Sequence, residues 1–394
     1  MSPERARGRC ARRVAAAALG ALALAGCGGN TSGGDTDAGG AVGCTVGADK
    51  RIGIATGNAT GVYFALGNAF AEVLPDATDG KVRATAAETG GSVENIEQLV
   101  ADKYQVAFAL ADSAADAVAG EASFDGKKQP VRALARIHTS YTQLVARADA
   151  HIGSVADLRG KRVATGPPRS GTEVIAQRIL RAAGLDPDSD VKAQRLDLAK
   201  TVDGMKDGTV DAMFFSGGLP TPGIADLFTT EKDGVRLVDV SPLLGKMRDV
   251  SQAYLGGSIP AGTYGIAADV PTIVVPNLLL VREDADADLA CVLTKALFSH
   301  RDDLVRSNAS AADIRIETAR DTGPVPLHRG AVKALDDLGA PPAGTPFTPA
   351  PVGSAAASAA PSGSPSDEPS ESPSASPSAS ATPSASASPT RTPG

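Results

Sequence analysis

The residues best suited to bind a ligand are Ser170, Gly171 and Thr172, which follow a Gly-Pro-Pro turn at the predicted start of a helix. Ser170 stands three residues before Glu173, the spacing of a capping box, and apolar residues then recur at helical intervals. A helix that begins in this way directs unpaired backbone N–H groups at whatever lies above the preceding strand, Val163–Ala164. That geometry suits a carboxylate or a phosphate. Ser170 could equally act as a helix cap and nothing more.

Gly166 and Gly171 have the glycine spacing of a phosphate-binding P-loop, Gly-x-x-x-x-Gly. Thr172 and Glu173 stand where that motif has Lys and then Ser or Thr. Without the lysine, and with an acid in the first turn, a nucleoside triphosphate is a poor candidate ligand. A small carboxylate is a better one.

Other turns of the same kind follow further predicted strands. From residue 44 to about 348, short apolar runs alternate with helical patterns, which predicts an α/β fold. Within it, residues 134–147 are expected to form paired extended segments. Ligands of open parallel sheets bind at the carboxyl ends of the strands. Each of these turns can also be explained as a turn or cap alone. The candidate contacts are Thr56, Gly57 and Tyr63; Gly90, Gly91, Ser92 and Asn95; Asp112; and the strand-end turn Ser216, Gly217 and Gly218.

The two ends of the chain have compositions unlike that of a folded domain. Residues 1–26 combine an Arg-rich start with the apolar run Val14–Ala25, which is too short to span a membrane and predicts a secretory signal peptide. Cys27 follows Leu-Ala-Gly as in a bacterial lipobox, so we expect it to carry lipid and to anchor the chain in the bilayer. An ordinary secreted protein is the alternative. Residues 27–43 are interpreted as a flexible tether and residues 349–394, rich in Pro, Ser and Ala, as a disordered tail.

Charge, cysteine and histidine content narrow the function classes. The formal net charge of −7 argues against nucleic acid as a partner. Cys10 lies in the predicted signal peptide and Cys27 is the predicted lipidation site, so Cys44 and Cys291 are the cysteines left in the folded region. In an oxidising compartment they would form either a disulfide or two separate buried thiols. None of the four His residues stands in a nucleophile motif or in metal-ligand spacing, so we expect no catalysis, metal or cofactor.

Over roughly residues 50–335 the chain resembles the solute-binding proteins of the TAXI family, the TRAP-associated extracytoplasmic immunogenic proteins. The motifs that carry the resemblance occur in the right order. They are Gly61-Val-Tyr-Phe-Ala-Leu-Gly, Thr89-Gly-Gly-Ser-Val-Glu-Asn, Asp157-Leu-Arg-Gly-Lys-Arg-Val, Gly166-Pro-Pro-Arg-Ser-Gly-Thr-Glu, Ile259-Pro-Ala-Gly-Thr-Tyr, Leu293-Thr-Lys-Ala-Leu-Phe and Pro326-Leu-His-Arg-Gly-Ala.

The resemblance implies a two-lobed fold of the type II periplasmic-binding-protein kind, with lobe 1 at residues 44–145 and 265–348 and lobe 2 at residues 146–264. The lobes would close by a hinge on a carboxylate or amino acid such as glutamate, glutamine or a 2-oxo acid. A monomeric binding protein would then deliver this solute to a TRAP permease. A solute-sensing lipoprotein and a binding protein of an ABC importer are the alternatives.

The resemblance also implies roles for individual residues. Ser170, Gly171 and Thr172 would hold the carboxylate, Tyr63 would pack on the solute, and Gly90–Ser92 would line the facing lobe. Ser216–Gly218 and Tyr264 are further candidates for contact with the solute. Arg169 departs from the family pattern, and it would either add a bidentate carboxylate contact or point to solvent.

Overall fold

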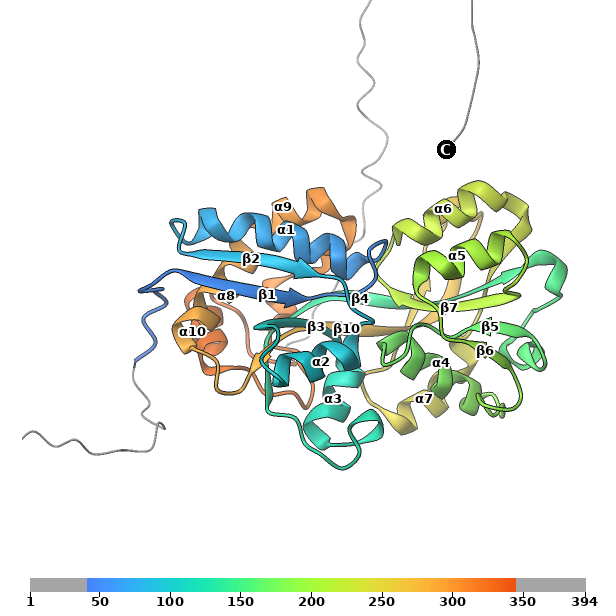
Figure 1. Cartoon of the computed structure of the whole chain (residues 1–394), viewed down its shortest axis with the longest axis horizontal. Coiled ribbons are helices and arrows are strands. Elements are labelled where there is room, and N and C mark those ends of the chain that lie inside the picture. The colour runs from blue at the N-terminus through green and yellow to red at the C-terminus, as the bar shows by residue number, and fades with distance from the viewer. Residues whose placement is uncertain (1–40, 345–394) are drawn as a thin grey trace, which may run out of the picture. The chain divides into compact units, whose positions relative to one another are not determined.

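The computed structural model describes residues 41–344, and these form the predicted α/β fold (Figure 1). The predicted signal peptide, the lipidation site Cys27, most of the tether and the predicted tail lie outside the described residues. Within residues 41–344 no helix is both long and apolar enough to cross a bilayer.

The strands of the described chain form one mixed sheet. Its main path runs β2-β1-β3-β10-β4-β7-β5-β6, with β8 paired to β4 and β9 paired to β10. The strands are β1 Lys50–Ala55, β2 Val82–Ala87, β3 Val106–Leu110, β4 Val131–Arg147, β5 Arg162–Ala164, β6 Lys192–Gln194, β7 Ala212–Gly217, β8 Val235–Val238, β9 Leu255–Ile259 and β10 Val270–Arg282.

Strands β4 and β10 lie in the middle of the sheet and are shared by two parts of it (Figure 1). The half of β4 before Tyr141 pairs with β10, and the half from Tyr141 onward pairs with β7 and β8. Likewise β10 pairs with β9 up to Val274 and with β3 from Asn277. We call residues 41–140 and 275–344 the first part and residues 141–274 the second part. The predicted lobe boundaries, 145/146 and 264/265, lie about five and about ten residues from these changes of pairing.

The direction of β4 decides which strand ends meet. Strands β1, β2 and β3 lie parallel to one another, and β3 and β4 are each antiparallel to β10. Strand β3 therefore points along β4 toward the second part. Strand β7 is antiparallel to β4 and parallel to β5, so both point toward the first part. The carboxyl ends of the two sets of parallel strands consequently face each other.

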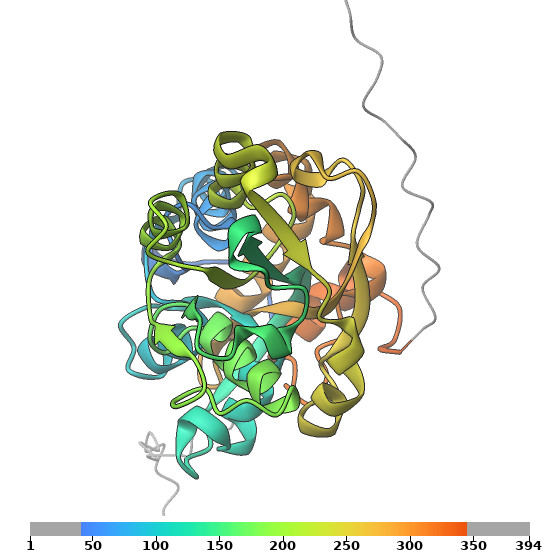
Figure 2. The same ribbon diagram turned by 90° about the vertical axis from the view of Figure 1, so that its right-hand side faces the viewer.

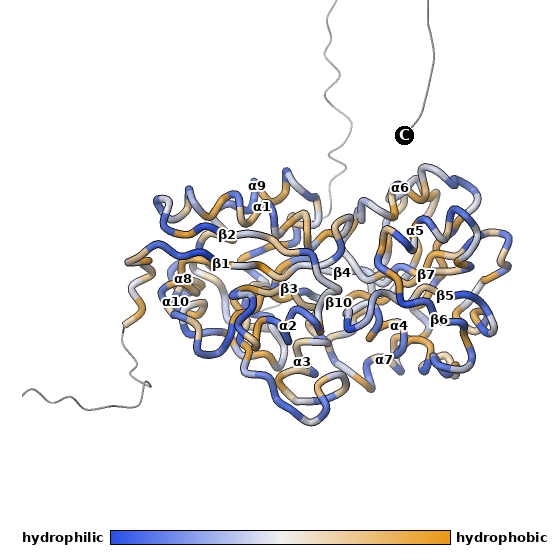
Figure 3. The backbone as a smooth tube through the Cα atoms, viewed as in Figure 1, coloured by the Kyte–Doolittle hydropathy of each residue, from blue (hydrophilic) through white to orange (hydrophobic). Residues whose placement is uncertain are grey.

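Helices cover both faces of the sheet, as the view along the second part shows (Figure 2). Their hydrophobic and hydrophilic residues alternate along the chain, as expected of helices with one buried side (Figure 3). They are α1 Val62–Ala77, α2 Ser92–Val100, α3 Ala111–Ala119, α4 Gly171–Ala182, α5 Leu198–Lys206, α6 Pro222–Glu231, α7 Leu244–Val250, α8 Ala287–Ser299, α9 Arg301–Ser307 and α10 Arg329–Asp337.

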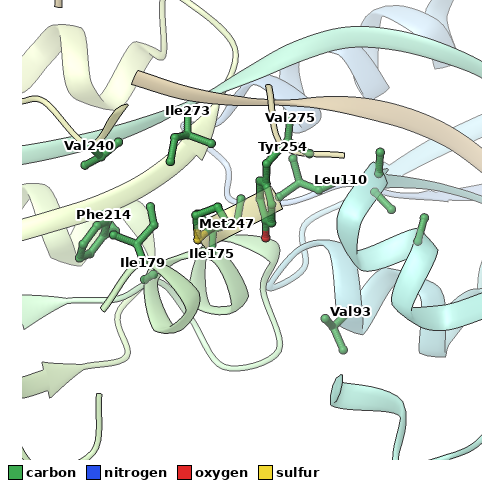
Figure 4. Packing of buried hydrophobic residues seen from close by; sticks show 14 of the residues in the cluster. Val93, Leu110, Ile175, Ile179, Phe214, Val240, Met247, Tyr254, Ile273 and Val275 are labelled. Carbon is green, nitrogen blue, oxygen red and sulfur yellow. The ribbon is translucent and has the colours of Figure 1, made fainter. Parts of the chain in front are cut away.

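On one face of the sheet each part has its own apolar cluster, under α1, α8 and α10 in the first part and under α5 and α6 in the second. The cluster on the other face is shared by both parts. It joins Val93 and Leu110 of the first part to Ile175, Phe214 and Tyr254 of the second (Figure 4). The two parts are therefore packed against each other along one side of the sheet.

One predicted element was wrong in kind. Residues 134–147 were expected to form paired extended segments, but β4 is a single strand of 17 residues. At about 3.3 Å per residue it is about 55 Å long, enough to run through both parts of the sheet. Most strands in globular proteins have 3–10 residues, so a sequence pattern of this length suggests a hairpin.

Cys44 and Cys291 form a disulfide with a Cα–Cα distance of 5.1 Å. The bond attaches the start of the described chain to α8, across a sequence separation of 247 residues. Closing so long a loop restricts the unfolded chain.

We therefore expect reduction by dithiothreitol to lower the free energy of unfolding of the full chain by about 2–5 kcal/mol. Urea unfolding with and without the reductant measures this. The double variant Cys44→Ala/Cys291→Ala should not respond to the reductant. An unchanged unfolding midpoint of the wild-type chain after verified reduction would contradict this expectation.

Candidate functional site

A pocket lies where the carboxyl ends of the parallel strands of the two parts meet. Its walls come from the turns after β1, β2 and β5, from the start of α1, and from the last residues of β3 and β7. The space open to the centre of a water molecule is about 50 Å³. The lining residues are Gly57, Asn58, Gly61, Val62, Tyr63, Gly90, Gly91, Ser92, Leu110, Pro167, Ser170, Gly171, Thr172, Phe215, Ser216 and Gly217.

Three helices begin at this pocket. The N-caps of α1, α2 and α4 are Gly61, Gly91 and Ser170, and all three line it. Each helix start carries backbone N–H groups that the helix itself cannot satisfy, together with the positive end of the helix dipole. Within residues 41–344, the N–H groups that donate no hydrogen bond include those of Val62 and Tyr63 in α1, Ser92 and Val93 in α2, and Gly171 and Thr172 in α4.

Hydroxyl groups complete the polar lining. Ser170 Oγ accepts a hydrogen bond from the Glu173 N–H at 3.0 Å, which is the predicted N-cap. The Glu173 carboxylate bonds the N–H of Arg169 at 2.8 Å instead of that of Ser170, so the second half of the predicted capping box is shifted by one residue. Thr172 Oγ1 accepts from the Ser216 N–H at 3.1 Å. The Ser216 hydroxyl oxygen is itself buried and has no partner among the described residues.

The Tyr63 ring forms one wall of the pocket. Its hydroxyl donates to Asn277 Oδ1, and its ring centroid lies 5.2 Å from that of Phe108 and 5.7 Å from that of His138. Burial raises the pKa of the Tyr63 hydroxyl above its ordinary value, so the group is neutral. Because the hydroxyl is used by Asn277, Tyr63 offers the pocket mainly its ring.

The two parts of the fold touch directly around the pocket. Asn58 Oδ1 accepts a hydrogen bond from the Leu198 N–H at 2.8 Å, and the Glu94 N–H donates to the Arg169 carbonyl at 3.0 Å. Arg169 also forms an ion pair with Glu97 at the surface, with Nε and Oε2 2.6 Å apart. The Arg169 side chain is exposed to solvent, which was one of the two expected alternatives, and there it also bridges the two parts.

Ten of the candidate residues line the pocket. They are Gly57, Tyr63, Gly90, Gly91, Ser92, Ser170, Gly171, Thr172, Ser216 and Gly217. Thr56, Asn95, Asp112, Gly218 and Tyr264 are not among its lining residues, so their predicted contacts with a ligand stay predictions.

Two of these five support the pocket from behind. Thr56 and Asn95 are fully buried. The Asn95 side-chain amide donates to the carbonyls of Thr56 and Phe108 at 2.5 and 2.8 Å. It thereby links the ends of β1 and β3 to the start of α2, and it has no remaining donor for a ligand.

Gly218 and Tyr264 contact neighbouring segments of the chain. The place of a Gly218 Cβ is occupied by Ser310, whose Oγ would lie 2.3 Å away. The Tyr264 hydroxyl donates to Gln143 Oε1 at 2.7 Å and accepts from the Thr221 N–H at 2.8 Å, and its ring stacks on Phe228. Tyr264 therefore fixes the loop before α6.

Asp112 belongs to a buried cluster that joins α3 of the first part to α4 of the second. Arg178 donates to Asp112 Oδ2 at 3.2 Å and to Asp116 Oδ2 at 2.7 Å. The Tyr254 hydroxyl donates to Asp112 Oδ2 at 2.6 Å. Burial raises the pKa of Asp116 to about 6, a rise that Arg178 reduces and that Asp112 and Glu121 increase.

The pocket also contains residues that the sequence patterns did not single out. Asn58 and Gly61 belong to a turn with a recognisable composition, so their type was a usable signal. Leu110 and Phe215 are strand residues that lie close to the opposite part. Their roles depend on the arrangement of the two parts, and local pattern carries no sign of it. The missed lining residues are Asn58, Gly61, Val62, Leu110, Pro167 and Phe215.

The described residues include no group of three or more His, Cys, Asp or Glu side chains that could hold a metal ion. The model of the NMT1-like family matches residues 54–339.

The chain is also similar to solved structures of binding proteins. The aliphatic sulphonate binding protein SsuA of Escherichia coli is 15% identical, with a TM-score of 0.42 and coverage of 74% of this chain and 84% of that one. A binding protein of an ABC phosphonate transporter from Pseudomonas aeruginosa is 13% identical, with a TM-score of 0.46 and coverage of 68% and 80%. A TRAP periplasmic solute-binding protein from Bordetella bronchispeptica is 12% identical, with a TM-score of 0.38 and coverage of 73% and 93%.

The position of Asp116 predicts a pH dependence of stability. Its folded-state pKa of about 6 lies above the ordinary 3.8, so the folded state favours its protonated form. The contribution of Asp116 to the free energy of unfolding should therefore be complete below pH about 4 and be lost as the pH rises through about 6. It should amount to about 1–3 kcal/mol. Urea unfolding between pH 4 and 7 tests this, with Asp116→Asn as the non-titrating control. Parallel pH profiles of the two proteins would contradict it.

Proposed function

The chain belongs to the NMT1-like family of solute-binding proteins, and we propose that it captures a small carboxylate-bearing solute between the two parts of its fold. The observation that carries this proposal is the meeting of three helix starts, with undonated N–H groups, in one pocket. Such groups are ready-made hydrogen-bond donors for an anion.

Ser170, Gly171 and Thr172 supply two of the free N–H groups together with two hydroxyls. The starts of α1 and α2 supply the facing N–H groups, so a carboxylate between them would receive hydrogen bonds from both parts. The buried Ser216 hydroxyl, which has no partner among the described residues, provides a further donor.

We propose that capture involves closure of the two parts, with β4 and β10 acting as the hinge. These strands are the continuous connections within the sheet, and the contacts of Asn58 with Leu198 and of Arg169 with Glu94 and Glu97 hold the parts together. A solute that bonds to both parts stabilises the closed arrangement by its differential affinity for it.

The proposed location is the outer face of the bacterial cell membrane. The Cys44–Cys291 disulfide suits an oxidising compartment, and the lipobox at Cys27 would supply the anchor. The resemblance of the sequence motifs to the TAXI family favours a TRAP permease as the partner that receives the solute.

Thermal unfolding of the full chain with propionate, pyruvate, 2-oxoglutarate, glutamate and glutamine tests the proposed function. An acid present at about 100 times its dissociation constant should add about 2.7 kcal/mol to the free energy of unfolding. The double variant Ser170→Ala/Thr172→Ala should lose this response.

The loss of the Ser170 cap alone should lower stability by about 1 kcal/mol. Asp286→Ala is the matched control, because Asp286 caps α8 away from the pocket. It should lower stability by a similar amount and keep the full response to the acid. A Ser170→Ala/Thr172→Ala variant that still responds fully would remove the start of α4 from the site.

Gly171→Ala tests closure. The added Cβ would lie 2.4 Å from Leu110 Cδ1 and 2.7 Å from Ser92 Oγ, both in the opposite part. We expect the closed state to be disfavoured and the affinity for the best acid to fall by about tenfold or more. Titration calorimetry measures the affinity.

The matched control is Gly245→Ala in α7, where a Cβ would meet nothing within 4 Å. This variant should bind as the wild-type chain does. Equal affinities of the two glycine variants would show that binding does not require the two parts to approach at Gly171.

A further inference from the structure

No charged side chain is found among the described residues that line the pocket. Asn, Ser, Thr and Tyr are the polar residue types among the lining residues, with Gly, Val, Leu, Pro and Phe. The single titratable group, the Tyr63 hydroxyl, is neutral because burial raises its pKa. Any charge on the solute must therefore be balanced by backbone and hydroxyl dipoles.

The acids nearest to the walls are already engaged. Glu94 accepts hydrogen bonds from the Gly90 N–H at 2.8 Å and from the Gln98 side chain. Glu173 accepts from the Arg169 N–H and pairs with Arg195. An ammonium group on the solute would find no carboxylate in the wall, and the three helix starts would repel it.

The neighbouring cations are engaged as well. Arg169 pairs with Glu97, Arg178 with Asp112 and Asp116, and Arg195 with Glu173. The positive field in the pocket thus comes from the helix starts, each equivalent to roughly half an elementary charge. Glu94 and Glu173, in the first turns of α2 and α4, reduce it. The field can balance one negative charge, but a second would lie buried without a counter-charge.

The rest of the wall is apolar and the space is small. Val62, Leu110, Pro167 and Phe215 are the apolar residues larger than Gly that line the cavity, whose volume open to water-molecule centres is about 50 Å³. A short hydrocarbon segment would fill this side without leaving polar groups unpaired.

We propose that the solute is a small organic monoanion with a short apolar remainder, without an ammonium group or a second acidic group. The inference rests on the proposed function and narrows it. The inference excludes glutamate, glutamine and 2-oxoglutarate as the solute. The anionic group can be a carboxylate or a sulfonate, because helix starts bind both by charge and by hydrogen bonds.

Matched solutes test this by titration calorimetry on the full chain, unfolded and refolded to remove any carried-over solute. Propionate, butyrate, pyruvate and ethanesulfonate are the monoanions. Alanine adds an ammonium group to propionate, and succinate adds a second carboxylate. We expect at least one monoanion to bind at least 100-fold more tightly than alanine, succinate, glutamate and 2-oxoglutarate. Gly171→Ala should weaken that binding and Gly245→Ala should not.

The outcomes separate the inference from the function on which it rests. Binding of alanine, glutamate or a diacid as tightly as any monoanion, and weakened by Gly171→Ala, would overturn the inference and leave the proposed function standing. Binding of no acid by the refolded wild-type chain, with its secondary structure verified by circular dichroism, would overturn both. Preference for ethanesulfonate over propionate would assign the anionic group as a sulfonate.

Discussion

The constraint on which the site depends is the continuity of β4 and β10 through both parts of the sheet. Strand β3 has the same direction as β4, and β7 has the opposite direction. The parallel strands of the two parts therefore point at each other. Turns that would lie at separate edges in two independent sheets therefore face across one pocket. The helices that follow these strands then begin at the same place, which makes their dipoles additive.

Two kinds of contact hold this arrangement together. The shared apolar cluster, from Val93 to Tyr254, packs the parts along one face of the sheet. Arg178 adds a buried polar contact between α3 and α4, next to that cluster. Removing one partner of such a pair leaves an uncompensated buried charge, so the cluster constrains how α3 and α4 can be placed. Among residues 41–344, the acidic and basic neighbours of the pocket pair with one another, and none of them is a lining residue.

The sequence predicted most of the secondary structure and the greater share of the lining residues. The turns after β1, β2, β5 and β7 were recognisable because Gly, Ser and Thr at strand ends have local conformational and capping reasons to be there. Predicted contact residues that do not line the pocket have other partners in the structure. Asp112 has the composition of a strand-end ligand, yet Arg178, 66 residues away in sequence, uses its carboxylate inside the core. Tyr264 is likewise engaged by Gln143 and Thr221.

By itself the sequence determined the α/β alternation, the cap at Ser170 and the set of turns from which a site could be built. These follow from local propensity and periodicity, which act over a few residues. Only the tertiary structure decided that β4 is one strand shared by both parts, that Leu110 and Phe215 line the pocket, and that no charged residue is among its described lining residues. Those outcomes depend on strand pairings and ion pairs between residues far apart in sequence, whose partners are set by the packing of the whole chain.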